Sequence, residues 1–263
     1  MRVTSKWFIL SRLTKKRGGA IMINIFTLSH AMLHPFSTEG KIDPFEFKKI
    51  PKWHPYRSIW TLHSRVLERN SRTFPFKFDE SALRSSRHRR YDRGESLVDT
   101  AVTAHQLELL QLSVLSSANV DGYIVEIGSY RGVTTAHLAS ETSKTIYAVD
   151  PFMGYGGADE DYNIFERNTR NISNINHIRL PSGSAAVDFK GDISLLFIDA
   201  VHDFSNSWFD FCAWSPKVAA NGFIAMHDVD DFPGVGKTCQ LINSLPAYSI
   251  WAYAPNIVIF QKS

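Results

Sequence analysis

Cysteine is scarce in this sequence, because Cys212 and Cys239 are the only two among 263 residues. Two cysteines cannot build a disulfide framework, and no Cys-x-x-Cys pair is present to bind zinc. A reducing compartment is the simplest explanation for so few thiols, so the sequence predicts a cytoplasmic protein. Both cysteines fall in helical patterns, and we expect them to be core residues.

Long apolar runs are lacking as well. The apolar stretches 7–10 and 20–28 fall well short of the roughly 20 residues that a membrane-spanning helix needs. We therefore expect no transmembrane segment. Neither stretch has the apolar core and the small-residue cleavage site of a secretory signal either. Two alternatives stay open for the start of the chain: residues 1–17 loosely fit a mitochondrial presequence, and Met22 could be the true first residue.

Acidic residues are depleted in the first third of the chain. Residues 1–95 contain 20 Lys and Arg but 8 Asp and Glu, whereas residues 96–263 contain 9 and 18. Such an asymmetry indicates a boundary between a basic arm and an acidic domain. Prolines and aromatic residues scattered over 34–78 predict an irregular extension that packs on the main domain or on a second subunit, which leaves a homo-oligomer open.

The densest charge run, 84–93, has two interpretations. It could bind phosphate, nucleic acid or an anionic substrate, or it could be a solvated linker. Neither interleaved aromatic residues nor a nucleic-acid-binding motif accompany it, so we expect no nucleic-acid partner.

A strand, a glycine turn and a helix start follow one another between Tyr123 and Gly132. Tyr123–Ile127 is apolar and β-branched, with the acid Glu126 near its end, and Gly128 allows a turn that a ligand can approach closely. In open α/β sheets this arrangement holds a nucleotide-like ligand beyond the first strand, against the free N–H groups of the helix. The spacing Glu-x-Gly-x-x-x-Gly disfavours NAD, and an acid before the glycines suits a ligand with an amine.

Short apolar runs alternate with helical patterns over the rest of the chain. The alternation predicts a Rossmann-like, doubly wound α/β sheet of seven strands, mostly parallel, with an antiparallel hairpin at its C-terminal end. The expected organisation is an extension, 1–95, followed by the main domain, 96–263. The predicted strands are 123–127, 145–149, 177–180, 193–198, 223–226, 249–253 and 257–261, and the predicted helices are 96–117, 133–140, 159–172, 204–219 and 234–245.

Two further positions fit a nucleoside ligand. The second predicted strand ends in Asp150, 22 residues beyond Gly128, where an acid can accept hydrogen bonds from ribose hydroxyls. Phe152 could then lie against an adenine face or be a core contact. A turn after the third strand contains Gly183 and Ser184, which can offer a backbone N–H and a hydroxyl to an adenine edge.

Polar side chains follow the fourth and fifth predicted strands, whose carboxyl ends should open on one crevice. Asp199 and Asp228 could share a divalent cation, and His202 could take a proton from a substrate hydroxyl. His227 is a further candidate ligand. The alternatives are that Asp199 contacts only the cofactor, that Asp228 caps a loop and that both histidines are structural.

With these residues placed, the chain resembles class I S-adenosylmethionine-dependent methyltransferases over about 96–263. Within that superfamily it is similar to a group that includes sugar and natural-product O-methyltransferases and cephalosporin-hydroxylase-like proteins. The matching stretches are Val125–Gly132, Tyr147–Pro151, Leu196–His202 and Asn221–Asp228.

The resemblance implies a role for each part of the site. The turn Glu126–Gly132, which includes Ser129, would hold the methionine part of S-adenosylmethionine, Asp150 the ribose and Ser184 the adenine. It also implies Mg²⁺ or another divalent cation at Asp199 and Asp228, with His202 as the base. Some relatives carry an acid where this chain has His227, so the ligand set departs from theirs.

The expected function is therefore methyl transfer from S-adenosylmethionine to a hydroxyl of a small-molecule or glycan acceptor. The reaction is an in-line displacement that requires alignment of two reactants and removal of a proton. The alternative is an inactive methyltransferase-like binding module that acts through the basic arm.

Overall fold

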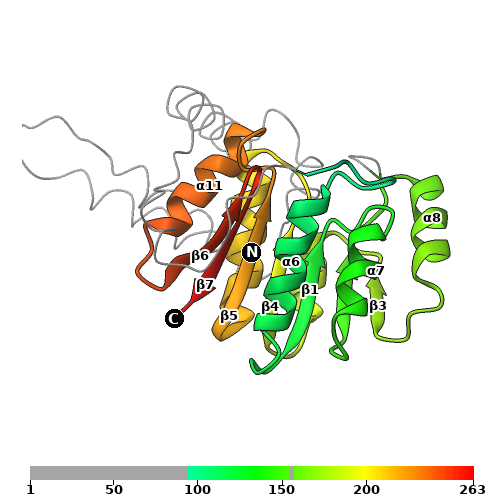
Figure 1. Ribbon diagram of the computed structural model, residues 1–263, viewed down its shortest axis with the longest axis horizontal. Coiled ribbons are helices and arrows are strands. Elements are labelled where there is room, and N and C mark those ends of the chain that lie inside the picture. Colours follow the sequence, from blue (N-terminus) through cyan, green and yellow to red (C-terminus); the bar gives the residue numbers. More distant parts are fainter. Residues whose placement is uncertain (1–93, 154–156) are drawn as a thin grey trace, which may run out of the picture. The chain divides into compact units, whose positions relative to one another are not determined.

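The computed structural model describes residues 94–153 and 157–263, and Figure 1 shows their arrangement. The predicted extension, 1–95, lies outside the described residues apart from its last two positions. The strands are β1 (Tyr123–Ile127), β2 (Ile146–Val149), β3 (Ile175–Ile178), β4 (Ile193–Ile198), β5 (Val218–His227), β6 (Tyr248–Ala254) and β7 (Ile257–Lys262). The helices are α6 (Ala104–Ser116), α7 (Val133–Ser140), α8 (Asp159–Thr169), α9 (Ser182–Asp188), α10 (Phe204–Trp214) and α11 (Pro233–Asn243), with a 3₁₀ turn at Ser215–Lys217.

The seven strands form one sheet in the order β3-β2-β1-β4-β5-β7-β6. The first five strands pair in parallel, whereas β7 lies antiparallel between β5 and β6. The strand order reverses between β1 and β4, which is the point where open α/β sheets bind ligands. The predicted seven-stranded, mostly parallel sheet with an antiparallel C-terminal hairpin is confirmed.

The centre of the sheet is its most completely buried part. Every residue of β4 is buried, as expected for a strand of six residues with a single polar member, Ser194. Leu195 and Phe197 face one side, where they pack with Leu109, Leu138 and other residues of α6 and α7. Burial of one such side chain stabilises the fold by about 1.5–3 kcal/mol, so this core fixes the strand ends at which the polar side chains sit.

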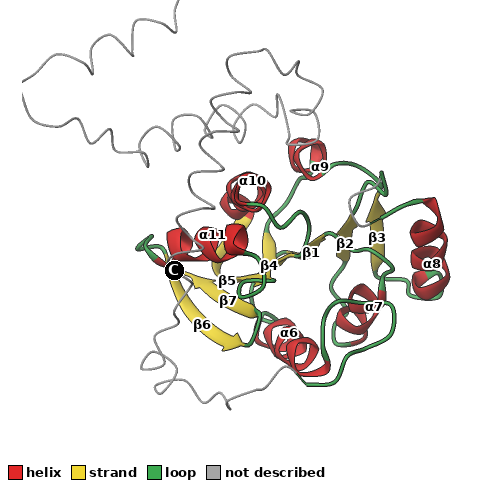
Figure 2. Ribbon diagram, turned by 90° about the horizontal axis from the view of Figure 1, so that it is seen from above, coloured by secondary structure: helices red, strands yellow, loops and turns green. Residues whose placement is uncertain are grey.

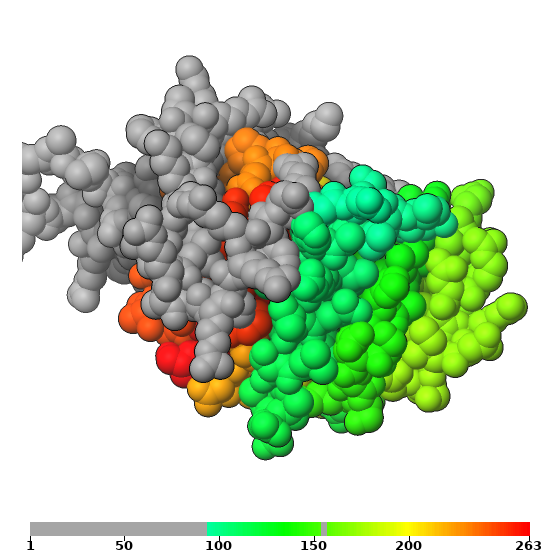
Figure 3. All heavy atoms as spheres, viewed as in Figure 1, coloured from blue at the N-terminus to red at the C-terminus, as the bar shows by residue number. Residues whose placement is uncertain are grey.

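Helices cover both faces of the sheet. Seen from above, α9, α10 and α11 lie on one side and α6 and α7 on the other, with α8 beside the β3 edge (Figure 2). The segment before α6, in cyan, and α8, in yellow-green, lie at the same end of the molecule's described part (Figure 3). Arg131 connects them, because its side chain forms ion pairs with Asp99 at 2.5 Å and with Asp161 at 2.7 Å.

The helix predicted from residue 96 begins later, at Ala104. Asp99 has a left-handed backbone (φ 61°), and Ser96 pairs with Thr103 in an isolated bridge. Thr103 and Gln106 then form a capping box, in which the Thr103 N–H donates to Gln106 Oε1 at 2.8 Å. The apolar residues 97–102 mimic helical spacing, but the cap decides where the helix starts.

Other boundaries differ from the predictions as well. The helix predicted over 204–219 ends at Trp214, because β5 begins at Val218. The third strand lies two residues earlier than predicted, at Ile175–Ile178, and the segment predicted as a turn after it starts α9, with Pro181 at the N-cap. Asn221, predicted to form a turn before the fifth strand, lies inside β5, where the pairing with β4 is irregular. Asn221 has φ 63°, so the bulge absorbs the left-handed residue.

Candidate functional site

A cavity of about 560 Å³ opens at the carboxyl ends of the central parallel strands. Gly128 and Ser129 after β1, Asp150 after β2 and Asp199 and His202 after β4 are part of its lining. Clefts of this volume are typical of sites for small molecules and cofactors. The topology therefore brings residues that are far apart in the sequence around one space.

The turn after β1 is built for close approach. Gly128 has φ +89°, and a Cβ atom at this position would lie 2.1 Å from the carbonyl oxygen of Asp199. Its N–H donates to the Val149 carbonyl at 2.9 Å, which joins the ends of β1 and β2. Ser129 Oγ is buried and has no hydrogen-bond partner among the described residues, although Ser129 lines the cavity. A ligand hydrogen-bonding group would satisfy it.

Asp150 ties together the loops after β1 and β2. Its Oδ2 accepts the N–H of Tyr130 at 3.0 Å and its Oδ1 accepts the N–H of Phe152 at 2.9 Å. Tyr130 and Phe152 both have left-handed backbones, with φ 46° and 49°. Each carboxylate oxygen keeps a second lone pair, so Asp150 can hold both loops and still accept hydrogen bonds from a bound diol.

Glu126 is a buried acid at the floor of the cavity, with 1% of its surface exposed. Burial raises the pKa of its carboxyl to about 8, and the charges of Asp199 and Asp150 act in the same direction. The hydroxyl of Thr135, on α7, donates to Glu126 Oε2 and opposes the shift. Without a ligand, Glu126 is therefore mostly protonated at neutral pH.

Acidic residues outnumber basic ones in the described part of the cavity wall, although Asp99 and Asp161 pair with Arg131 and Glu126 holds a proton. Among the described residues it contains no Lys or Arg, and its carboxylates are those of Asp99, Glu126, Asp150, Asp161, Asp199 and Asp210. Such a wall favours ligands that carry positive charge.

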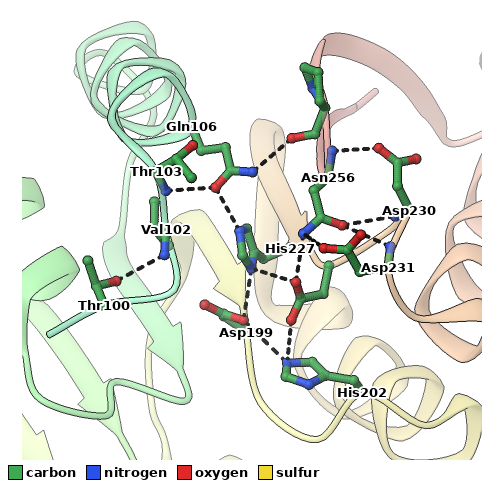
Figure 4. Close-up of polar contacts among 12 residues, drawn as sticks. Thr100, Val102, Thr103, Gln106, Asp199, His202, His227, Asp230, Asp231 and Asn256 are labelled. Atoms are coloured by element: carbon green, nitrogen blue, oxygen red, sulfur yellow. Dashed lines mark hydrogen bonds and ion pairs between the residues drawn. The ribbon is translucent and has the colours of Figure 1, made fainter. Parts of the chain in front are cut away.

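Beside the cavity, two carboxylates and two imidazoles form a closed cluster (Figure 4). His202 Nε2 lies 2.9 Å from Asp228 Oδ2 and 3.5 Å from Asp199 Oδ1. His227 Nδ1 lies 3.2 Å from Asp199 Oδ1 and 3.4 Å from Asp228 Oδ1. Phe232 stacks on the ring of His202, with 4.4 Å between ring centroids.

The cluster shifts the pKa values of its own members. Burial alone would lower the pKa of His202, but contacts with Asp199 and Asp228 outweigh it and raise the pKa to about 9. The same carboxylates raise the pKa of His227 to about 10 against the effect of burial. As arranged, His202 therefore holds its proton at neutral pH, unlike the free imidazole of pKa ~6.5 on which its predicted role as base depends.

The donor atoms of the cluster fit a divalent cation. Ligand atoms of Asp199, His202 and Asp228 lie within 4.8 Å of one another. Carboxylate oxygens and imidazole nitrogens are the usual protein ligands of such ions.

Two residues of the cluster's surroundings have no counterpart in the sequence-based prediction. Gln106, on α6, contacts His227 Nε2 through Oε1 at 3.0 Å. Asn256, in the β6–β7 hairpin, donates to Asp228 Oδ1 at 2.7 Å and accepts backbone N–H groups of Asp230 and Asp231. Asn256 has a left-handed backbone, with φ 71°. An asparagine after a proline is typical of such a turn, and this was the only sequence signal for its position.

Several predicted site residues lie beside the cavity rather than in its described wall. Phe152 is 4% exposed and packs edge-on against Tyr162 and Phe165, the core role that the sequence left open. Gly132 lies against Phe165, where a Cβ atom would be 2.7 Å from a ring carbon. Of the pair after β3, Gly183 lines the cavity and Ser184 is outside its described lining.

Within the described ranges, none of the helices combines the length and the apolarity that crossing a bilayer requires.

Comparisons with known proteins agree with this geometry. Residues 125–229 match a family model described as "Methyltransferase domain". Cofactor-bound Rv0187 from MTB has a similar fold, with TM-score 0.52 and 13% identity, over 84% of this chain and 98% of that one. The O-methyltransferase NovP matches with TM-score 0.51 and 17% identity, over 78% and 98%. No curated protein matches the sequence.

The matched stretch runs from β1 to the loop after β5 and so contains Gly128, Asp150, Asp199, His202 and Asp228. At these sequence identities the two solved structures support only the fold, whereas the family match indicates the type of domain. Residues 125–229 therefore match a methyltransferase domain, and the described part of the chain has the fold of these two solved structures.

Proposed function

We propose that this enzyme methylates a hydroxyl oxygen of a small molecule or sugar, with a divalent cation beside that hydroxyl. The observation that carries the proposal is the sharing of one cavity by two sets of residues. Gly128, Ser129 and Asp150 lie at the ends of β1 and β2, whereas Asp199 and His202 follow the neighbouring β4. A methyl donor and an acceptor could thus meet without leaving the cavity.

The first set supports a nucleoside with an amino acid tail. Asp150 has lone pairs left for two ribose hydroxyls, and the turn at Gly128 admits a ligand close to the backbone. Ser129 Oγ offers an unused hydrogen-bonding group. Glu126 lies where an ammonium group would favour its ionised form, so its burial becomes an advantage once the cofactor is bound.

The second set supports proton removal from the acceptor. S-adenosylmethionine supplies a methyl group on a positively charged sulfur, so the protein's task is to align the reactants and take a proton. Asp199 and Asp228 would hold the cation, which supplies Lewis acidity at a hydroxyl. His202 lies beside both carboxylates and lines the cavity. With those carboxylates engaged by a cation, the cause of its raised pKa would be removed, and we assign His202 the acceptor's proton.

The charge of the cavity favours a neutral acceptor. Its described wall carries carboxylates and no Lys or Arg, which suits the cationic donor but repels an anionic acceptor. A hydroxyl compound therefore fits better than a carboxylic acid. Methyl transfer from labelled S-adenosylmethionine to matched alcohol, phenol, carboxylate and amine acceptors tests this order. Intact cofactor binding without transfer to any of them would favour the inactive binding module.

Cofactor binding should depend on pH through Glu126. With a pKa of about 8 in the free protein, binding near neutrality should release about 0.9 proton, and affinity should rise up to about tenfold per pH unit below pH 8. Isothermal titration in buffers with different ionisation enthalpies measures the released proton. Glu126→Gln should abolish the release, whereas the exposed control Glu108→Gln should keep it.

The same group sets a pH dependence of stability. Because the folded pKa of Glu126 lies above its ordinary value of 4.5, the folded protein holds a proton that the unfolded chain releases between these values. The stabilising contribution is complete below about pH 4.5 and is lost as the pH rises through about 8. Urea unfolding of the cofactor-free protein should therefore lose less stability between pH 6 and 8 in Glu126→Gln than in the parent.

Replacing His202 should separate binding from turnover. We expect His202→Ala to lower kcat by about 10²–10⁴-fold, the usual contribution of a positioned proton acceptor, while the Kd for S-adenosylmethionine changes less than about threefold. His137→Ala, an exposed histidine on α7, is the matched control and should change neither quantity. Unchanged turnover in His202→Ala would remove the base assignment.

A further inference from the structure

The side chain of Gln106 has a single orientation that satisfies its neighbours. Gln106 is 1% exposed, and its Nε2 donates to the carbonyl oxygen of Pro255 at 2.8 Å. Its Oε1 accepts the N–H of Thr103 at 2.8 Å. Reversing the amide would place its NH₂ group against the N–H of Thr103 and its oxygen against the carbonyl oxygen of Pro255. The amide oxygen must therefore face Thr103.

This orientation fixes the tautomer of His227. The same Gln106 oxygen lies 3.0 Å from His227 Nε2, and a carbonyl oxygen can only accept. Nε2 therefore carries a hydrogen, and Nδ1 is the ring nitrogen that faces the cluster (Figure 4). A histidine that ligates a metal is usually held in this way, with its other N–H donated to an oxygen behind it.

In front of Nδ1 the cluster presents only acceptors. Asp199 Oδ1 lies at 3.2 Å and Asp228 Oδ1 at 3.4 Å from this nitrogen. The side chain of His227 is 1% exposed, so bulk water does not separate these groups. A lone pair that faces two carboxylates requires a cation between them, either a proton on the ring or a metal ion.

We propose that Gln106 positions His227 as an imidazole ligand, so that the site takes a transition-metal cation such as Zn²⁺ or Co²⁺ in preference to Mg²⁺. The donor set is then the imidazole Nδ1 of His227 and the carboxylates of Asp199 and Asp228, with His202 beside the ion as the proton acceptor. Imidazole suits Zn²⁺, Co²⁺ and Fe²⁺, whereas Mg²⁺ favours an octahedral shell of oxygen ligands. The proposal deepens the proposed function, because the same cation would lie beside the acceptor hydroxyl.

The spacing of the donor atoms is compatible with one shared ion. Metal–ligand bonds of about 2.0–2.2 Å place adjacent donors roughly 2.9–3.6 Å apart. The distances from His227 Nδ1 fall in this range, at 3.2 Å to Asp199 Oδ1 and 3.4 Å to Asp228 Oδ1. Asn256 orients the Asp228 carboxylate by donating to its Oδ1 at 2.7 Å, while Oδ2 lies 2.9 Å from His202 Nε2.

Metal titrations of three proteins test the assignment. Zn²⁺ and Mg²⁺ affinities are measured by calorimetry on chelator-treated full-length protein, and Co²⁺ serves as an absorption probe of nitrogen ligation. In His227→Asp the ratio of Zn²⁺ to Mg²⁺ affinity should fall at least tenfold, and the Co²⁺ spectrum should change. Gln106→Leu, which keeps the ligands but loses the oxygen behind His227, should weaken Zn²⁺ binding by about 10–100-fold. Gln111→Leu, on the same helix, should bind Zn²⁺ like the parent.

Two results would overturn the proposal. One is an affinity ratio in His227→Asp that stays within threefold of the parent, and the other is parental Zn²⁺ affinity in folded Gln106→Leu. If Gln106→Leu does not fold, the affinity ratio in His227→Asp decides. Titration of S-adenosylmethionine into the chelator-treated protein tests the proposed function separately. If S-adenosylmethionine binds but the metal affinities contradict the proposal, the methyltransferase assignment still holds.

Discussion

Asp150→Ala should reduce the affinity for S-adenosylmethionine by at least about 100-fold. The substitution removes the acceptors for two ribose hydroxyls, and hydrogen bonds to a charged group contribute about 1.5–3 kcal/mol each. It also frees the N–H groups of Tyr130 and Phe152, whose left-handed backbones then have no shared anchor. Isothermal titration with S-adenosylmethionine and S-adenosylhomocysteine measures the loss.

A control separates the site from the general loss of a charge. Asp188 is exposed at the end of α9 and is not part of the described cavity wall, so Asp188→Ala should keep the parental Kd. Asp150→Ala with a Kd within threefold of the parent would show that the ribose is not bound here.

Gly128→Ala should destabilise the domain and abolish cofactor binding through a single added methyl group. The added Cβ would lie 2.1 Å from the Asp199 carbonyl oxygen, in a backbone with φ +89°. Left-handed strain costs about 1–3 kcal/mol and overpacking about 1–3 kcal/mol more, so we expect a loss of roughly 2–6 kcal/mol in the free energy of unfolding. Because the clash pushes the loops after β1 and β4 apart, cofactor binding should also disappear.

Gly191→Ala is the matched comparison for backbone strain. Gly191 has φ +119°, and its Cβ would lie 2.8 Å from a ring carbon of Tyr123, just before β4 and at the end of the strands opposite the cavity. Urea unfolding should show destabilisation in both variants. The folded Gly191→Ala protein should bind S-adenosylmethionine normally, whereas folded Gly128→Ala should not. Normal binding by Gly128→Ala would mean that the turn does not receive the cofactor.

The sheet was predictable because its strands are short, apolar and separated by helical patterns. The prediction for β4 matches its bounds, since Ile193–Ile198 has no charged residue to blur its ends. Boundaries failed where a local cap or a left-handed residue outweighed the apolar spacing. The left-handed Asp99 keeps the helix from starting at residue 96, so that α6 begins only after the N-cap Thr103. The left-handed Asn221 lets β5 continue through a bulge.

The candidate site was predictable only as far as strand ends define it. Asp199, His202, His227 and Asp228 follow two adjacent parallel strands, and the structure brings all four into one cluster. Gln106 could not be predicted, because it reaches His227 across 121 positions from a helix that carries no motif. Its partner Pro255 lies in a hairpin whose packing against α6 no local pattern reveals.

A crystal structure with S-adenosylhomocysteine examines the shared cavity most directly. The ribose hydroxyls should lie within hydrogen-bonding distance of Asp150, with the amino acid tail near Glu126 and Ser129 and the sulfur directed toward Asp199 and His202. A molecule bound elsewhere, or bound in the cavity with its ribose away from Asp150, would contradict the assignment.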